Sequence, residues 1–212
     1  GEWVIRQARA ETGQWEGNFR IAINLSATQV RSPHLADVVA QAIHAHGIAP
    51  HRVEFEITEH VLMQNSDLCE GNLAKLRELG TKVALDDFGI GYSSLSYLRR
   101  FPFDRIKIDK DFVEGIEASA DNQAIVSSIT RLADALGMAA TAEGVETRAQ
   151  LDLLRKLGCQ EAQGYLICQP VPGENFATPA AVQAAMQGDA SGILDYRKAR
   201  EAALRRRSSR AS

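Results

Sequence analysis

The sequence has few cysteines and no long hydrophobic run. Its three cysteines, Cys69, Cys159 and Cys168, are too few and too widely spaced for a disulfide framework or a zinc site. A reducing cytoplasm is therefore the expected location. No stretch approaches the roughly 18 consecutive apolar residues of a membrane span, and early charges such as Glu2 and Arg6 exclude a signal-peptide core. We expect no direct membrane contact from this segment.

An initiator methionine is also missing, since the chain begins at Gly1, and we expect the natural protein to begin further upstream. The net charge is small, −3 over 212 residues, but it is unevenly spread. Residues 188–212 hold seven basic and three acidic residues, so the body carries the acidic excess. An acidic body is not typical of a DNA- or RNA-binding protein. We expect one domain over residues 1–187 and a basic, partly disordered tail over residues 188–212.

Apolar runs of strand length alternate with stretches of helical periodicity along the chain. The helical faces lie at 35–43, 73–79 and 125–136, and glycines follow them where helix C-termini are expected. This alternation predicts a parallel sheet, either a doubly wound open sheet or a (β/α)8 barrel. The predicted strands are 20–26, 52–58, 81–86, 104–109 and 138–143.

The two faces of each predicted strand differ in character, which favours the barrel. Val53, Phe55 and Ile57 alternate with Glu54 and Glu56, and the other strands repeat this division into bulky apolar and small or polar residues. Both faces of an open sheet meet helices and would be apolar. In a barrel, the polar face lines the lumen.

The chain is short for a complete barrel. Such barrels use roughly 250 residues, whereas the alternating region ends near Met186. No strand is predicted before Ile21, and the pattern over residues 1–15 predicts a helix. We therefore expect an incomplete barrel that lacks about two strands of the usual eight.

Five polar residues occupy late positions on the lumen face of the predicted strands: Asn24, Glu56, Asp86, Lys107 and Glu143. Barrel enzymes place their chemistry at this C-terminal rim. Any one of these residues could simply cap the following helix. Five at equivalent places favour a common site.

Oxygen ligands dominate this rim. Asn24, Glu56, Asp86 and Asp87 supply hard oxygens, which select Mg²⁺ or Mn²⁺ over zinc. The adjacent carboxylates of Asp86 and Asp87 repel each other unless cations hold them. Two ions at such a site suit displacement at phosphorus, so phosphodiester hydrolysis is the predicted reaction. The five histidines of the chain fall on predicted helices and loops and have no role in this prediction.

Two features of the rim have alternative interpretations. Lys107 could hold the attacking water or neutralise growing charge, or it could form a structural ion pair with Asp109 or with a rim carboxylate. The glycine-containing loop over residues 88–94 could approach a phosphate or act as a mobile lid, or it could be an ordinary tight turn.

Several segments together resemble the successive motifs of one known family, the EAL domain phosphodiesterases of bacterial cyclic di-GMP signalling. The resemblance runs from about Gly1 to Met186, and the motifs follow the order of the family. They are Asn24-Leu25-Ser26, Glu56-Ile57-Thr58-Glu59, Asp86-Asp87-Phe88-Gly89, Lys107-Ile108-Asp109, Ala142-Glu143-Gly144-Val145-Glu146 and Gln163-Gly164-Tyr165-Leu166.

The resemblance implies a TIM-like (β/α)8 barrel with one antiparallel strand, which hydrolyses cyclic di-GMP to linear pGpG with two Mg²⁺ or Mn²⁺ ions. Asn24, Glu56 and Asp86 would hold the first metal ion. Asp86, Asp87 and Glu143 would hold the second.

The same resemblance implies roles for further residues. Lys107 would position the attacking water, and Glu143 would also serve as the general base. Glu59 would anchor the loop after Asp87 and couple it to a homodimer interface. Gln163 would belong to the substrate or water network, although a strand-end hydrogen-bonding role is equally open. Asp109, in the lysine motif, is included among the substrate-binding candidates.

One departure from the family pattern is at the front. The Glu-Ala-Leu motif, which supplies a metal-binding glutamate, does not occur in the chain. The missing strands and the missing ligand are interpreted as one gap, so we expect these 212 residues alone to be inactive or weak. A sensory or diguanylate cyclase (GGDEF) domain, or a membrane anchor, would lie upstream. The alternative function is a receptor or interaction module that binds cyclic di-GMP without cutting it.

Overall fold

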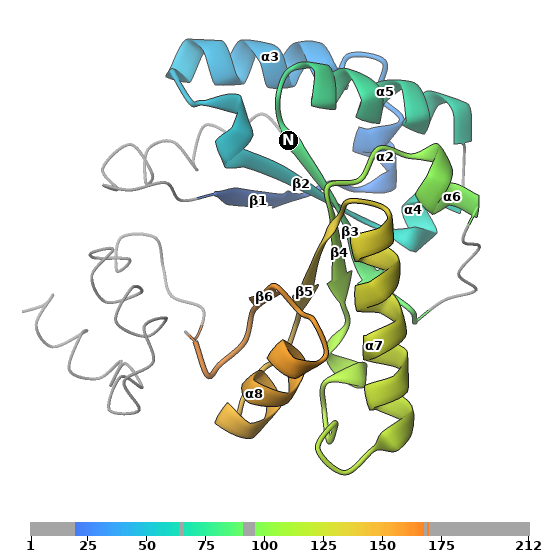
Figure 1. The fold of residues 1–212 in the computed structure, drawn as a ribbon. Helices are drawn as coiled ribbons and strands as arrows, with labels where there is room; N and C mark the ends of the chain where they lie inside the picture. Colours follow the sequence, from blue (N-terminus) through green and yellow to red (C-terminus); the bar gives the residue numbers. More distant parts are fainter. Residues whose placement is uncertain (1–19, 64–65, 91–95, 168, 170–212) are drawn as a thin grey trace, which may run out of the picture.

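The computed structural model describes residues 20–63, 66–90, 96–167 and 169 (Figure 1). Its centre is a parallel sheet of six strands in the order β1-β2-β3-β4-β5-β6, so that each strand pairs with the next one along the chain. The strands are β1 (Ile21–Asn24), β2 (Val53–Thr58), β3 (Lys82–Phe88), β4 (Arg105–Ile108), β5 (Ala139–Ala142) and β6 (Glu161–Ala162).

This strand order decides between the two folds left open by the sequence. A doubly wound sheet reverses its strand order at a switch point, where connections change from one face to the other. No reversal occurs among the six described strands, which curl into a half-barrel of the (β/α)8 type. The five predicted strands are confirmed, and β6 is an addition that the sequence pattern did not predict.

Helices follow the strands and begin and end at residues suited to these positions. Ser26 and Thr147 form capping boxes with Gln29 and Gln150, and Gly47 ends α3 in the left-handed conformation with φ of 60°. The α-helices are α2 (Ala27–Val30), α3 (Leu35–His46), α4 (Glu59–Met63), α5 (Ser66–Glu78), α6 (Ser96–Arg100), α7 (Ala120–Ala135) and α8 (Arg148–Lys156). Two 3₁₀ helices are η1 (Pro50–Arg52) and η2 (Lys110–Phe112).

The main core lies between the outer face of the sheet and these helices. Phe55 and Ile57 on β2 and Ile106 and Ile108 on β4 are almost fully buried. They belong to the apolar set of the strand alternation, and their burial against helices leaves the polar set facing the lumen. The predicted division between the two strand faces is confirmed.

Some sequence predictions lie outside the described residues. They are the helix over residues 1–15, the tail over residues 188–212 and the domain boundary at residue 187. Within the described ranges, no helix is both long enough and apolar enough to cross a bilayer.

Candidate active site at the strand ends

Lys107 is the centre of the polar rim. Its Nζ lies 3.0 Å from Oε1 of Glu56, 2.8 Å from Oδ1 of Asp86 and 2.6 Å from Oε1 of Glu143. These carboxylates come from β2, from β3 and from the residue that follows β5, so the fold brings together residues 87 positions apart. The ion-pair partners of Lys107 are thus rim carboxylates and not Asp109.

The charge state of Lys107 is fixed by these partners. Burial favours the neutral amine, but hydrogen bonds from the ammonium to Asp86 and Glu143, together with the negative charges of Glu143 and Glu56, outweigh it and raise the pKa of Lys107. The side chain is only 6% exposed, so the ammonium is a buried cation held by three acceptors. A group of this kind stays charged at any physiological pH.

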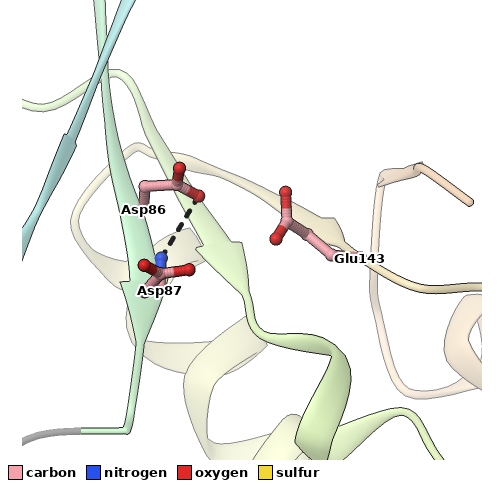
Figure 2. Close-up of side chains that lie close together, drawn as sticks. All are labelled: Asp86, Asp87 and Glu143. Atoms are coloured by element: carbon pink, nitrogen blue, oxygen red, sulfur yellow. Dashed lines mark hydrogen bonds between the residues drawn. The ribbon is translucent and has the colours of Figure 1, made fainter. Parts of the chain in front are cut away.

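Asp86 and Asp87 reach the same site because β3 is irregular at its end. The pairing of β3 with β4 shifts register between Leu85 and Phe88, and Asp87 takes a left-handed backbone with φ of 54°. In a regular strand, consecutive side chains would point to opposite faces. The irregularity instead gathers both carboxylates near Glu143, as Figure 2 shows. The backbone N–H of Asp87 also donates to Oδ1 of Asp86, at 3.2 Å.

The left-handed conformation at Asp87 carries a cost. Asp is among the few non-glycine residues that visit this region, and a residue held there marks backbone strain that is common at functional sites. The gain is geometric, since oxygens of Asp86, Asp87 and Glu143 lie within 4.8 Å of one another. This arrangement suits one cation shared by three carboxylates.

In the absence of a cation, the pKa values of three rim carboxyl groups are raised. Burial raises the pKa of Glu56 and of Glu143, although Lys107 opposes the shift at both residues. Burial, followed by the negative charge of Asp86, raises the pKa of Asp87. Each shift has the direction expected for carboxylates crowded in a partly desolvated place, and a divalent ion would reverse it.

The donor set fits a hard divalent cation. It consists of carboxylate oxygens, and Asn24 adds an exposed amide at the end of β1, in register with Glu56. The cluster found among the described residues contains neither cysteine nor histidine. The carboxylates of Asp86, Asp87 and Glu143 lie close together, and Asn24 and Glu56 are register partners on the neighbouring strands β1 and β2.

Glu59 links the start of α4 to the segment after β3. The side chain is buried, and its Oε1 accepts a hydrogen bond from the backbone N–H of Gly89 at 3.3 Å. A Cβ on Gly89 would lie 2.7 Å from Cε2 of Phe112, so this position requires glycine for close packing. The predicted contact between Glu59 and this loop is present, and residues 91–95 of the loop lie outside the described ranges.

The remaining two candidates adjoin the rim. Asp109 is buried and caps η2, where its Oδ1 accepts from the N–H of Asp111 at 2.8 Å. Gln163 follows β6, and its backbone N–H donates to the carbonyl of Ala142 at 2.8 Å, which places it beside the strand that leads to Glu143. A substrate-binding role for Asp109 and Gln163 stays a prediction.

The curled parallel half-barrel, with acidic residues at the carboxyl ends of its strands, defines a TIM-barrel-like protein with a candidate site for divalent cations. Comparison with known families identifies the class more closely. The family model described as "EAL domain" matches residues 1–170. The chain therefore belongs to the EAL domain family.

Individual relatives agree with this assignment. An uncharacterised protein of Sinorhizobium fredii is 44% identical over 172 residues, which cover 81% of this chain and 21% of the relative. The bifunctional diguanylate cyclase/cyclic di-GMP phosphodiesterase MucR of Pseudomonas aeruginosa is 38% identical over 185 residues, which cover 85% of this chain and 27% of that protein. The chain thus spans less than a third of the length of these curated relatives.

Solved structures match over most of the chain. The phosphodiesterase of MucR in complex with c-di-GMP has a TM-score of 0.76 and 39% identity, covering 83% of this chain and 73% of that one. A manganese/cy-diGMP complex of Klebsiella pneumoniae BlrP1 has a TM-score of 0.73 and 38% identity, covering 78% of this chain and 43% of that one.

Proposed function

We propose that the protein is a metal-dependent phosphodiesterase that hydrolyses cyclic di-GMP to linear pGpG. The observation that carries this proposal is the cluster of Asp86, Asp87 and Glu143, which is built by a strained strand end at the rim of the barrel. Family membership, and the structures of relatives in complex with c-di-GMP, support the choice of cyclic di-GMP as the substrate.

Two Mg²⁺ or Mn²⁺ ions would be held by residues of this rim. Asn24, Glu56 and Asp86 would bind the first ion, and Asp86, Asp87 and Glu143 the second. When bound, such ions lower the pKa of water and stabilise charge on the phosphoryl oxygens. The carboxylates provide negative charge in a partly desolvated place, where it attracts cations strongly.

Lys107 and Glu143 would act on the attacking water. Glu143 is the proposed general base, because its carboxylate can accept a proton and lies beside those of Asp86 and Asp87. The ammonium of Lys107, 2.6 Å from Glu143, would orient the water and offset negative charge that develops at the phosphate.

The other candidates would support this centre. Glu59 would hold the segment after β3 through Gly89 and transmit changes there to a homodimer interface. Asp109 and Gln163 would contribute to substrate binding at the edge of the rim. In its cellular setting, the domain would work in the cytoplasm, joined to an upstream sensory or diguanylate cyclase domain, and would not bind DNA or RNA.

Product analysis tests the proposal. The protein is purified together with the upstream segment that is expected to carry the Glu-Ala-Leu motif, it is incubated with cyclic di-GMP and Mn²⁺ or Mg²⁺, and pGpG is measured by chromatography. We expect pGpG to form, EDTA to stop it, and Asp87→Ala to abolish it. Asp152→Ala, which removes an exposed carboxylate on α8, is the control and should leave the rate unchanged. Binding of cyclic di-GMP without pGpG would contradict the proposal and indicate a receptor.

A further inference from the structure

A second layer of polar side chains lies in the lumen, one level below the proposed metal site. Its centre is Arg105 on β4, whose side chain is 5% exposed. The guanidinium bonds to residues of three other strands, namely Glu54 on β2, Thr141 on β5 and Glu161 on β6. None of these residues belongs to the proposed catalytic set.

The contacts of Arg105 use the whole guanidinium fork. Nε donates to Oε2 of Glu54 at 3.0 Å, Nη1 donates to Oγ1 of Thr141 at 2.6 Å, and Nη2 donates to Oε1 of Glu161 at 3.0 Å. A planar fork with fixed donor directions holds its acceptors at defined positions, which a lysine ammonium does not.

Arg20 extends this layer to the other edge of the sheet. It precedes β1, and its Nη2 lies 2.6 Å from Oε1 of Glu161 on β6. Its Nη1 lies 3.5 Å from Oε2 of Glu54. Because β1 and β6 are the two outer strands of the described sheet, the layer joins those strands across the lumen.

The lower layer and the rim are related residue by residue. Each lower residue lies on a strand, and the residue two positions after it, on β2 and β4 or just past the end of β5 and β6, is a member of the proposed site. Residues two apart point to the same face and are separated by about 7 Å along the strand. The pairs, lower member first, are Glu54 and Glu56, Arg105 and Lys107, Thr141 and Glu143, and Glu161 and Gln163.

Stability alone does not explain this layer. Burying charges is costly, and apolar side chains of similar volume often stabilise a core as well as a buried ion pair does. What a buried charged network can add is one defined arrangement of the elements it joins. Here those elements carry Glu56, Lys107, Glu143 and Gln163.

We propose that Arg105 is a positioning residue that sets the spacing of β2, β4, β5 and β6 beneath the rim. It thereby fixes the distances between the groups that bind cations above it. The role in hydrolysis rests on the proposed function, whereas the role in cation binding can be measured without turnover.

The test is the affinity of the full chain for Mn²⁺, measured by calorimetry without substrate. Arg105→Met should weaken binding by about 10- to 100-fold, as found when residues that orient metal ligands are replaced. Removal of a positive charge by itself would tighten cation binding, so weaker binding reports lost positioning. Arg105→Lys restores the charge without the fork and should give an intermediate affinity.

Arg77→Met is the matched control, because it removes an exposed arginine that pairs with Asp104 and should not alter Mn²⁺ affinity. If Arg105→Met does not fold, Thr141→Val removes one acceptor while it keeps the side-chain volume. Weaker Mn²⁺ binding by Thr141→Val would then support the proposal. Unchanged or tighter Mn²⁺ binding in the folded variant, with only a lower melting temperature, overturns it.

Different experimental results would contradict this inference and the proposed function. A wild-type protein with the expected upstream segment that binds Mn²⁺ and loses affinity on Arg105→Met, yet forms no pGpG, contradicts the phosphodiesterase and supports the positioning role. A wild-type chain that forms pGpG, and whose Arg105→Met variant keeps its Mn²⁺ affinity, contradicts the positioning role and supports the phosphodiesterase.

Discussion

Replacing Lys107 by methionine tests how strongly the rim depends on its internal cation. The ammonium lies 2.6–3.0 Å from carboxylates of Glu56, Asp86 and Glu143, and methionine keeps most of the aliphatic stem while it removes the charge. The substitution thus keeps the packing largely intact, but it leaves three carboxylates close together with no ammonium between them. Without metal ions, the folded state should lose stability.

The size of the loss follows from burial. The side chains of Glu56, Asp86 and Glu143 are 9%, 12% and 18% exposed, so the site is well shielded from water. Removing one partner of a buried ion pair costs about 3–5 kcal/mol. We therefore expect a loss of about 3–5 kcal/mol in the free energy of unfolding at pH 7. The loss should shrink at acidic pH, because Glu56 and Glu143 then take up protons.

Urea unfolding followed by circular dichroism, with chelator or with Mn²⁺, measures this effect. A ligand at 100 times its dissociation constant stabilises the state it binds by about 2.7 kcal/mol. Mn²⁺ should stabilise Lys107→Met more than the wild type, since the ammonium no longer competes for the carboxylates. The control Lys82→Met removes an exposed lysine that pairs with the partly buried Asp104, which keeps Arg77 as a second partner, and should cost at most about 1 kcal/mol. A loss for Lys107→Met no larger than that of the control would refute this reasoning.

Three further predictions concern single residues. Asp87→Asn keeps a side chain that tolerates the left-handed backbone, so the urea midpoint should stay near that of the wild type. The same variant should lose pGpG formation, and retained hydrolysis would rule out the second cation site. Burial raises the pKa of Glu143 above its ordinary value of 4.5, so this group takes stability away from the metal-free protein as pH rises above 4.5. Glu143→Gln should accordingly become more stable relative to wild type as pH increases in chelator, and a difference independent of pH would be inconsistent with the raised pKa. Gly144→Ala would place a Cβ 2.5 Å from Cβ of Lys110 at a φ of 67°. The free energy of unfolding, measured by thermal unfolding, should fall by about 1–3 kcal/mol. An unchanged melting temperature would show that the turn adapts.

The barrel architecture could be predicted from the sequence because its signal is periodic. Val53, Phe55 and Ile57 are buried outside the lumen, and Glu54 and Glu56 lie within it, as the alternation along β2 requires. The strand β6 could not be predicted in this way. It has two residues, Glu161 and Ala162, which are too few to show a period.

The residues of the candidate site were predictable by type and by place along the strands, but their geometry was not. Alternation alone places Asp86 and Asp87 on opposite faces, and only the left-handed backbone at Asp87 brings the two carboxylates together. The partners of Lys107 were also open, because Asp109 is a neighbour in sequence. In the folded chain Asp109 caps η2, and Lys107 turns to the rim.

Arg105 shows a different limit of sequence reasoning. Its place in the strand pattern indicates a lumen position. The adjacent sequence does not indicate its acceptors, because these lie 51 residues before it and 56 residues after it. Contacts of this kind depend on the register of four strands at once. They become visible only when the sheet is assembled.

The central claim is that divalent cations bind among the carboxylates of this rim. Crystals of the full chain grown with Mn²⁺ and measured at the manganese absorption edge test it most directly. We predict anomalous peaks within ligand distance of Asp86, Asp87 and Glu143, and of Asn24 and Glu56. Crystals in which Lys107 keeps its three ion pairs and no anomalous peak lies at the rim, at saturating Mn²⁺, would contradict the claim.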